Sequence, residues 1–174
     1  RRPKTLDEAK EILSSLVGAT YKVQDIEVKP TKRHPAAPFT TSTLQQEASR
    51  RLGLSVTQTM RIAQSLYEAG HITYMRTDSV NLSSFAIGAT IEEVEKEYGK
   101  KYVKARNFKT STKGAQEAHE AIRPTHVEKI VAGTTKQEKA IYDLIRKRTM
   151  ASQMADAELE RTPVSYTHLR AHET

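Results

Sequence analysis

The sequence predicts a mainly α-helical protein, with two helices in helix-turn-helix, winged-helix-like order and a short α/β lead-in. Four predicted helix starts have Ser or Thr followed three positions later by Glu or Gln, the capping-box signature. Five segments space apolar residues at helical intervals, whereas few segments alternate as strands do. The four boxes are Thr5 with Glu8, Ser42 with Gln45, Ser55 with Gln58, and Thr135 with Glu138.

The lead-in begins with a predicted helix and a predicted strand. The first capping box opens the helix, whose apolar spacing continues until Gly18. Residues 21–28 alternate apolar and polar side chains, which indicates a strand. Three prolines then interrupt both patterns, so we expect a basic linker there. They are Pro30, Pro35 and Pro38.

A tight turn joins the next two predicted helices. The second and third capping boxes begin them, Gly53 ends the first and Gly70 ends the second. Residues 72–79 follow directly and are predicted to form a strand that carries Tyr74. This order is winged-helix-like, with Tyr74 on or beside the wing. A generic pair of packed helices is the alternative.

Two further helices complete the predicted domain. The third helix of the domain, counted without the lead-in helix, covers residues 84–98 and ends at Gly99. The fourth helix of the domain runs from Thr135 to about Ser152. We expect the third helix to present one apolar face made of Ile87, Ile91, Val94 and Tyr98. We expect the fourth to direct Ile141, Leu144 and Ile145 inward.

The composition favours a polyanionic partner. The 174 residues include 28 lysines and arginines against 21 acids, a formal net charge of +7. There is no cysteine, so disulfides and cysteine-based zinc sites are excluded within this chain. No apolar run reaches membrane-spanning length, no signal peptide opens the chain and no phosphate-binding loop is present. We expect a soluble, cytoplasmic protein of which this chain is a fragment.

Tyr74 and Arg76 are the strongest candidate catalytic residues. They lie two positions apart in a predicted strand, so both side chains are expected on one face. A tyrosine oxygen can attack a phosphodiester, and an arginine fork can hold the phosphate oxygens. The pair therefore indicates covalent chemistry on DNA. The alternative is an ordinary strand tyrosine beside a solvated arginine.

The motifs around this pair resemble those of bacterial type IA DNA topoisomerases, in order and spacing. The resemblance covers about residues 20–159. It rests on Pro38–Ala48, Thr59–Met60, Ala63–Gln64, Leu66–Gly70, Ile72–Ser79 and Ala118–Pro124.

The resemblance implies a mechanism. Tyr74 is expected to form a 5′-phosphotyrosyl link to one cut strand, a second strand passes through, and resealing without ATP relaxes negative supercoils. Arg76 is expected to act beside Tyr74, and His119 and Arg123 are expected near the DNA phosphate. Met75 favours relaxing over decatenating members of the family. The partner is expected to be single-stranded or underwound DNA, and the protein a monomer.

The resemblance also implies a domain organisation. Residues 1–37 are expected to end an arch and linker segment, residues 38–156 to form the active-site tyrosine domain, and residues 157–162 to begin a return strand. The metal-binding aspartates of the family are expected upstream of Arg1, so Mg²⁺ is not expected to bind to this chain. The fragment alone is therefore expected to be inactive.

A basic run between residues 100 and 113 contains six lysines and arginines and no acid, with Tyr102 and Phe108 interleaved. Such a run suits sequence-tolerant binding of single-stranded DNA. A solvated surface loop is an equal alternative. The candidate DNA-binding residues are Lys100, Lys101, Lys104, Arg106, Lys109 and Lys113.

Three other interpretations remain at this stage. A zinc-protease site at His119 fails because the required second histidine is replaced by Arg123; a helix-end contact of His119 and Arg123 is the structural alternative. Asp156, Glu158 and Glu160 alternate and are interpreted as a solvated strand edge. Residues 163–174 resemble a translated sequencing adapter, with a natural tail as the alternative.

The competing functional class is a non-catalytic winged-helix DNA-binding module. It explains the basic charge and the helix-turn-helix order. It gives Tyr74 and Arg76 no joint role.

Overall fold

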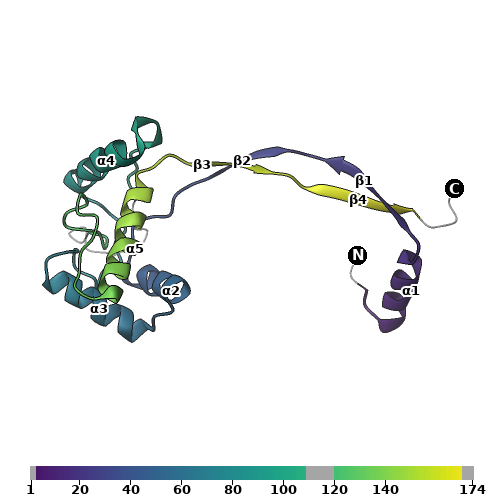
Figure 1. Cartoon of the computed structure of the whole chain (residues 1–174), viewed down its shortest axis with the longest axis horizontal. Helices are drawn as coiled ribbons and strands as arrows, with labels where there is room; N and C mark the ends of the chain where they lie inside the picture. The colour runs from purple at the N-terminus through teal and green to yellow at the C-terminus, as the bar shows by residue number, and fades with distance from the viewer. Residues whose placement is uncertain (1–2, 109–119, 170–174) are drawn as a thin grey trace. The chain divides into compact units, whose positions relative to one another are not determined.

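The computed structural model describes residues 3–108 and 120–169, except for the side chains of residues 24 and 165–169. The chain divides into two compact units, one made of residues 1–33 with 158–174 and the other of residues 34–157. Most of the described secondary structure is helical (Figure 1), which confirms the mainly α prediction. None of the described helices is long and apolar enough to cross a membrane.

The first unit contains the predicted lead-in helix and strand. Helix α1 is Leu6–Leu16, and strand β1, Thr20–Ile26, pairs antiparallel with β4, Val164–Leu169 (Figure 1). Strand β2, Lys29–Arg33, pairs with β3, Ala157–Arg161. No described residue of this unit is buried. The segment interpreted as an adapter includes β4, and its origin stays a prediction.

The first capping box forms only in part. The Thr5 hydroxyl accepts the backbone N–H of Glu8 at 3.2 Å, as a cap should. The Glu8 carboxylate, however, accepts the N–H of Lys4 at 2.7 Å instead of that of Thr5.

The predicted helix-turn-helix is present in the second unit. Helix α2 is Thr41–Leu52, helix α3 is Val56–Glu68, and Gly53 joins them in the left-handed conformation at φ +66°. A residue with a Cβ is disfavoured in that conformation, so glycine permits the tight turn. The box that begins α3 is confirmed.

The box predicted for α2 lies two residues earlier. Thr40 is the N-cap residue, its hydroxyl accepts the N–H of Thr43, and the Thr43 hydroxyl accepts the N–H of Thr40. Ser42 lies inside the first turn, where its hydroxyl contacts that of Thr40 at 3.1 Å. The prediction of a cap at Ser42 was therefore wrong.

The two later helices are confirmed, but one buried face is not. Helix α4 is Ser84–Tyr98, a short 3-10 helix follows at Lys100–Tyr102, and α5 is Lys136–Ser152, with its predicted capping box. The buried residues of α4 are Ala86, Thr90, Glu93 and Val94. Tyr98 is 49% exposed, so the predicted apolar face of α4 was wrong except at Val94.

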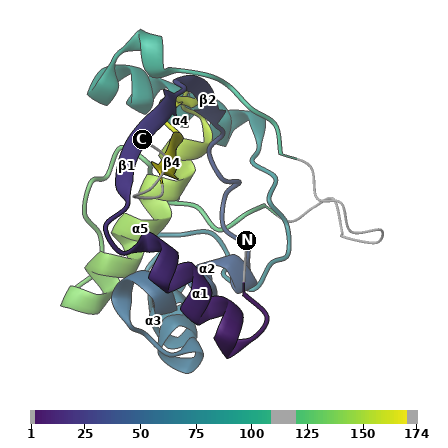
Figure 2. The ribbon, with the colours of Figure 1, turned by 90° about the vertical axis from the view of Figure 1, so that its right-hand side faces the viewer.

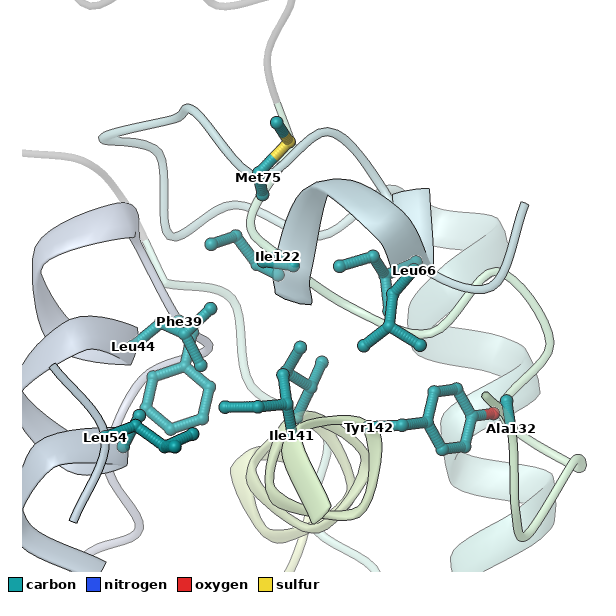
Figure 3. Close-up of a cluster of buried hydrophobic side chains, with 13 residues drawn as sticks. Phe39, Leu44, Leu54, Leu66, Met75, Ile122, Ala132, Ile141 and Tyr142 are labelled. Carbon is teal, nitrogen blue, oxygen red and sulfur yellow. The ribbon is translucent and has the colours of Figure 1, made fainter. Parts of the chain in front are cut away.

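Helix α5 lies at the centre of the second unit and packs against α2, α3 and α4 (Figure 2). Ile141 and Tyr142 of α5 face Leu44 of α2 and Leu66 of α3 across a closed core (Figure 3). All four side chains are at most 1% exposed. This burial is the main source of stability for the unit.

The segment of residues 72–79 is not a strand, so that prediction was wrong. Within the described part of the chain, its only ladder contact is an isolated antiparallel bridge between Ile72 and Pro124. A second isolated bridge joins Phe39 to Ile122. The three extended segments around residues 39, 72 and 122 therefore lie side by side without forming a regular sheet. A winged-helix arrangement is not confirmed.

Candidate active site

The segment that carries Tyr74 alternates between exposed and buried side chains, although it is not a strand. Tyr74 is 44% exposed and Arg76 is also exposed, whereas Met75 and Thr77 are 3% and 9% exposed. The extended backbone produces this alternation, because successive side chains point to opposite sides. Tyr74 and Arg76 therefore lie on the same, exposed side of the segment, as their two-residue spacing predicts.

Thr41, the first residue of α2, holds the inner side of this segment. Its hydroxyl donates to the carbonyl of Met75 at 2.8 Å, and its backbone N–H donates to the carbonyl of Thr77 at 2.9 Å. The N–H of Thr77 donates in turn to the Thr41 hydroxyl at 2.9 Å. The backbone is thus fixed on both sides of Arg76.

Thr73 fixes the other end of the segment. Its N–H donates to the carbonyl of Arg123 at 2.9 Å, and its hydroxyl donates to the carbonyl of Ala121 at 2.7 Å. The N–H of Arg123 donates back to the Thr73 hydroxyl at 3.0 Å. These bonds place the motif around residue 122 directly beside Tyr74 in the fold.

The Tyr74 ring packs edge-on against Tyr67 of α3. The ring centroids are 5.2 Å apart and the planes meet at 66°. An edge-to-face contact of this kind stabilises the position of both rings. Among the described residues, the Tyr74 hydroxyl has no hydrogen-bond partner, so its oxygen is available to a substrate.

Arg123 is held by its own motif. Its side chain is 14% exposed, and Nε and Nη2 donate to one Glu120 carboxylate oxygen at 3.1 and 2.6 Å. Nη1 donates to the carbonyl of Pro124 at 2.9 Å. A guanidinium has five N–H groups, so two are left without a partner among the described residues.

Glu120 orients this arginine and also the start of α4. Its second carboxylate oxygen accepts the N–H of Ser83, the N-cap residue of α4, at 2.7 Å. Burial raises the pKa of the Glu120 carboxyl, but the hydrogen bonds from Arg123 and Ser83 outweigh burial and hold that pKa below its ordinary value. Glu120 therefore stays ionised at neutral pH and keeps Arg123 in place.

The described part of the basic run is divided between free and engaged side chains. Lys100 and Lys101 are exposed, and the Lys101 ammonium lies 4.8 Å from the centroid of the Tyr102 ring, which is 42% exposed. Lys104 and Arg106, by contrast, both pair with Asp156. Arg106 also donates to the carbonyl of Met154.

Asp156 was interpreted as part of a solvated strand edge, and this was wrong. Its side chain is only 8% exposed and accepts hydrogen bonds from His34, Lys104 and Arg106. The hydrogen bonds from His34 and Lys104 lower the pKa of Asp156 to about 2. Glu158 and Glu160 are exposed, as predicted.

Several predicted site residues lie outside the described ranges. They are His119, Lys109 and Lys113. Over residues 3–108 and 120–169, no group of three or more His, Cys, Asp or Glu side chains is arranged to hold a metal ion.

The sequence did not identify the positioning roles of Thr41, Thr73 and Glu120. One signal was available for Thr41. Thr40 and Thr41 are adjacent at the start of a helix, and only one of them can serve as the N-cap residue, so the second hydroxyl must find a partner elsewhere. Nothing in the local sequence indicates that the partner is the segment carrying Tyr74.

Helix-turn-helix pairs such as α2 and α3 are common in DNA-binding domains. The sequence matches the family described as DNA topoisomerase over residues 1–173. The chain therefore belongs to the DNA topoisomerase family.

Individual relatives agree with this assignment. The chain is 51% identical over 166 residues to DNA topoisomerase 1 of Synechocystis, covering 91% of this chain and 18% of the relative. It is 56% identical over 155 residues to DNA topoisomerase 1 of Synechococcus elongatus, covering 86% and 18%. It thus spans about a fifth of the length of these relatives.

A solved structure agrees as well. Full-length topoisomerase I from Thermotoga maritima matches with a TM-score of 0.70 at 33% identity, covering 98% of this chain and 31% of that one. The fold is therefore that of a part of a bacterial topoisomerase I.

Proposed function

We propose that this chain is the tyrosine-bearing part of an ATP-independent type IA DNA topoisomerase. The observation that carries the proposal is the exposed Tyr74 and Arg76 pair on a backbone held rigidly by Thr41 and Thr73. Rigid presentation matters because a nucleophile and a phosphate-binding group must be oriented before they react. Residues 34–157, which approximate the predicted tyrosine domain, contain all of these groups.

The chemistry is a transesterification. The Tyr74 oxygen attacks the phosphorus, the bond from phosphorus to the 3′ oxygen breaks, and the leaving 3′ oxygen takes up a proton. The phosphate at the 5′ end of the downstream fragment remains joined to the Tyr74 oxygen. Attack by the 3′ hydroxyl reverses the step and reseals the strand, so no ATP is consumed.

Arg76 and Arg123 would stabilise the charge that develops on the phosphate oxygens. Arg76 is exposed, and no described residue forms an ion pair with it. The two unpartnered N–H groups of Arg123 give a second set of donors. His119 is proposed to assist as a further donor. Mg²⁺ is proposed to be held by other parts of the full-length enzyme. The roles proposed for Tyr74, Arg76 and Arg123 do not depend on it.

Lys100 and Lys101 are proposed to contact the DNA backbone, with the exposed Tyr102 ring beside them to stack on a base. The partner would be single-stranded or underwound DNA, bound by a monomer in the cytoplasm. Strand passage by the complete enzyme would then relax negative supercoils.

The experiment that tests the proposal places this chain in the matching segment of the Synechocystis DNA topoisomerase 1, which supplies the missing parts. A single-stranded oligonucleotide labelled at its 3′ end is incubated with the chimera and run on a denaturing gel. We expect the label to migrate with the protein, because the fragment that carries the 3′ label is the one whose 5′ phosphate becomes attached to Tyr74. A 5′-labelled strand should instead release a short free fragment.

Tyr74→Phe should abolish the adduct, whereas Tyr67→Phe is the matched control because that ring only packs against Tyr74. An adduct that persists in Tyr74→Phe would exclude this tyrosine as the nucleophile. Retained DNA binding without any adduct would favour a non-catalytic DNA-binding module. We also expect the isolated 174-residue chain not to relax plasmid DNA.

A further inference from the structure

A small cavity lies between α4, residues 123–128 and α5. Its volume is about 130 Å³, and its lining includes Phe85, Ala89, Arg123, Pro124 and Thr149. Tyr74 and Arg76 do not line it. The cavity is thus separate from the nucleophile but shares Arg123 with the proposed phosphate-binding groups.

The volume of the cavity suits one six-membered ring. An apolar cavity of about 150 Å³ in another protein accommodates a single benzene molecule. The cavity beside Arg123 is similar in size, so a fused two-ring purine is too large to enter it fully. A pyrimidine is the nucleic-acid base of matching size.

The walls provide flat apolar surfaces. Phe85, in the first turn of α4, is 79% exposed although it is a large aromatic side chain. Pro124 is another apolar residue of the lining. Stacking of a base on an aromatic ring is the usual way in which proteins hold single-stranded DNA.

Several polar residues also line the cavity, and two of them, Thr149 and Arg123, have groups without a partner among the described residues. Thr149 is 1% exposed, and its hydroxyl has no hydrogen-bond partner among the described residues. A buried hydroxyl without a partner is destabilising, and a ligand with a donor or acceptor on its ring edge removes that cost. Arg123 offers its two unpartnered N–H groups to a phosphate attached to the same nucleotide.

We propose that this cavity binds one pyrimidine base of single-stranded DNA, with the neighbouring phosphate at Arg123. The inference rests on the proposed function, because that function supplies a single strand near Arg123. It adds a base contact away from the point of cleavage. Positioning of the strand would then depend on a base as well as on the backbone.

The experiment measures non-covalent binding to the 174-residue chain carrying Tyr74→Phe, so that no reaction interferes. The probes are fluorescent five-nucleotide strands that are abasic at every position, or abasic except for a central thymine or a central adenine. All three carry the same phosphates. We expect the thymine strand to bind about fivefold more tightly than the abasic strand, and the adenine to add less.

Two variants locate the effect. Ala89→Leu fills the cavity, and Phe85→Ala removes the exposed ring; each should reduce the ratio of thymine to abasic affinity to about one. Ala36→Leu, at an exposed position outside the cavity, is the matched control and should keep the ratio. Thermal unfolding of each variant checks that it is folded. If Ala89→Leu is not folded, Phe85→Ala alone tests the role of the cavity.

The proposal is overturned if the thymine and abasic strands bind with equal affinity, or if neither variant changes the ratio of these two affinities. It is also overturned if a central adenine raises the affinity as much as a central thymine does. These outcomes are independent of the proposed catalysis. The covalent adduct of the chimera can form without a base in the cavity, and base binding can occur in a chain without Tyr74.

Discussion

Two regions of the second unit contain a tyrosine and an arginine and use them in opposite ways. Tyr74 and Arg76 are exposed, and their polar atoms have no partners among the described residues. Tyr142 and Arg146 of α5 are 1% and 6% exposed. The Tyr142 hydroxyl lies within hydrogen-bonding distance of the carbonyls of residues 126 and 129, at 3.1 and 2.7 Å.

Arg146 is held in the interior by three hydrogen bonds. It donates to the carbonyl of Val127 at 2.7 Å and pairs with Glu93 and Glu97 of α4. The comparison shows that residue type does not determine role. The same two side chains stabilise the fold where partners surround them, and they are available for chemistry where the backbone alone is held.

The largest effect should come from the interior arginine. Arg146→Met leaves the buried Glu93 carboxylate with only the longer contact to Lys96, at 3.6 Å, and we expect a loss of about 3 kcal/mol in the free energy of unfolding, measured by urea denaturation. Lys147→Met is the control, since its pair with Asp143 is exposed and should contribute little. Equal effects of the two substitutions would refute the structural role of Arg146.

A backbone effect should follow in the loop that precedes α5. Gly133 has φ +97°, and a Cβ there would lie 2.6 Å from the Cβ of Glu138. Gly133→Ala should therefore cost about 2 kcal/mol. Gly88→Ala, in the interior of α4 with open space around it, should instead stabilise by about 0.5 kcal/mol or more. Destabilisation by both substitutions would contradict this expectation.

A smaller effect is expected from the interior tyrosine. Tyr142→Phe removes the hydroxyl that bonds the loop carbonyls and should cost about 1 kcal/mol. Burial raises the pKa of Tyr142 to about 12. Because the folded pKa lies above the ordinary value, this contribution is complete below about pH 10 and is lost as the pH rises toward 12.

Unfolding measured between pH 8 and 12 checks this dependence. The parent chain should lose stability above about pH 10 more steeply than Tyr142→Phe. Parallel curves for the two proteins would show that Tyr142 does not titrate as its burial requires.

The smallest effect on stability should come from the exposed tyrosine. Tyr74→Phe keeps the edge-on ring contact with Tyr67 and removes a hydroxyl without a described partner. We expect no measurable change in the free energy of unfolding, even though the covalent adduct is lost. A clear destabilisation would mean that Tyr74 serves the fold as Tyr142 does.

Features determined by nearby residues could be predicted from the sequence. The boxes at Ser55 and Thr135 and the bounds of α4 follow from local patterns. The choice between Thr40 and Ser42 as the N-cap residue could not be made locally. Both have a hydroxyl, and each has a possible side-chain partner three positions later, Thr43 for Thr40 and Gln45 for Ser42. The predicted alternation of side chains around Tyr74 was correct because it too depends only on nearby residues. Side chains alternate along any extended backbone, with or without a partner strand.

Features determined by distant residues could not be predicted. The expected strand at residues 72–79 is absent because side-chain hydroxyls take the place of a neighbouring strand. The Thr41 hydroxyl binds the backbone of this segment at Met75, and the Thr73 hydroxyl joins the segment to the carbonyl of Ala121. Asp156 is buried because His34 and Lys104 approach it from far along the chain. The cavity beside Arg123 likewise needs three segments whose proximity no local pattern reveals.

The dual attachment of Thr41 has a mechanical consequence. This residue begins α2 and also binds the carbonyls of Met75 and Thr77, on either side of Arg76. Any rotation of α2 that preserves these bonds must turn the Arg76 backbone with it. The first helix of the helix-turn-helix is therefore mechanically coupled to the backbone that carries Arg76.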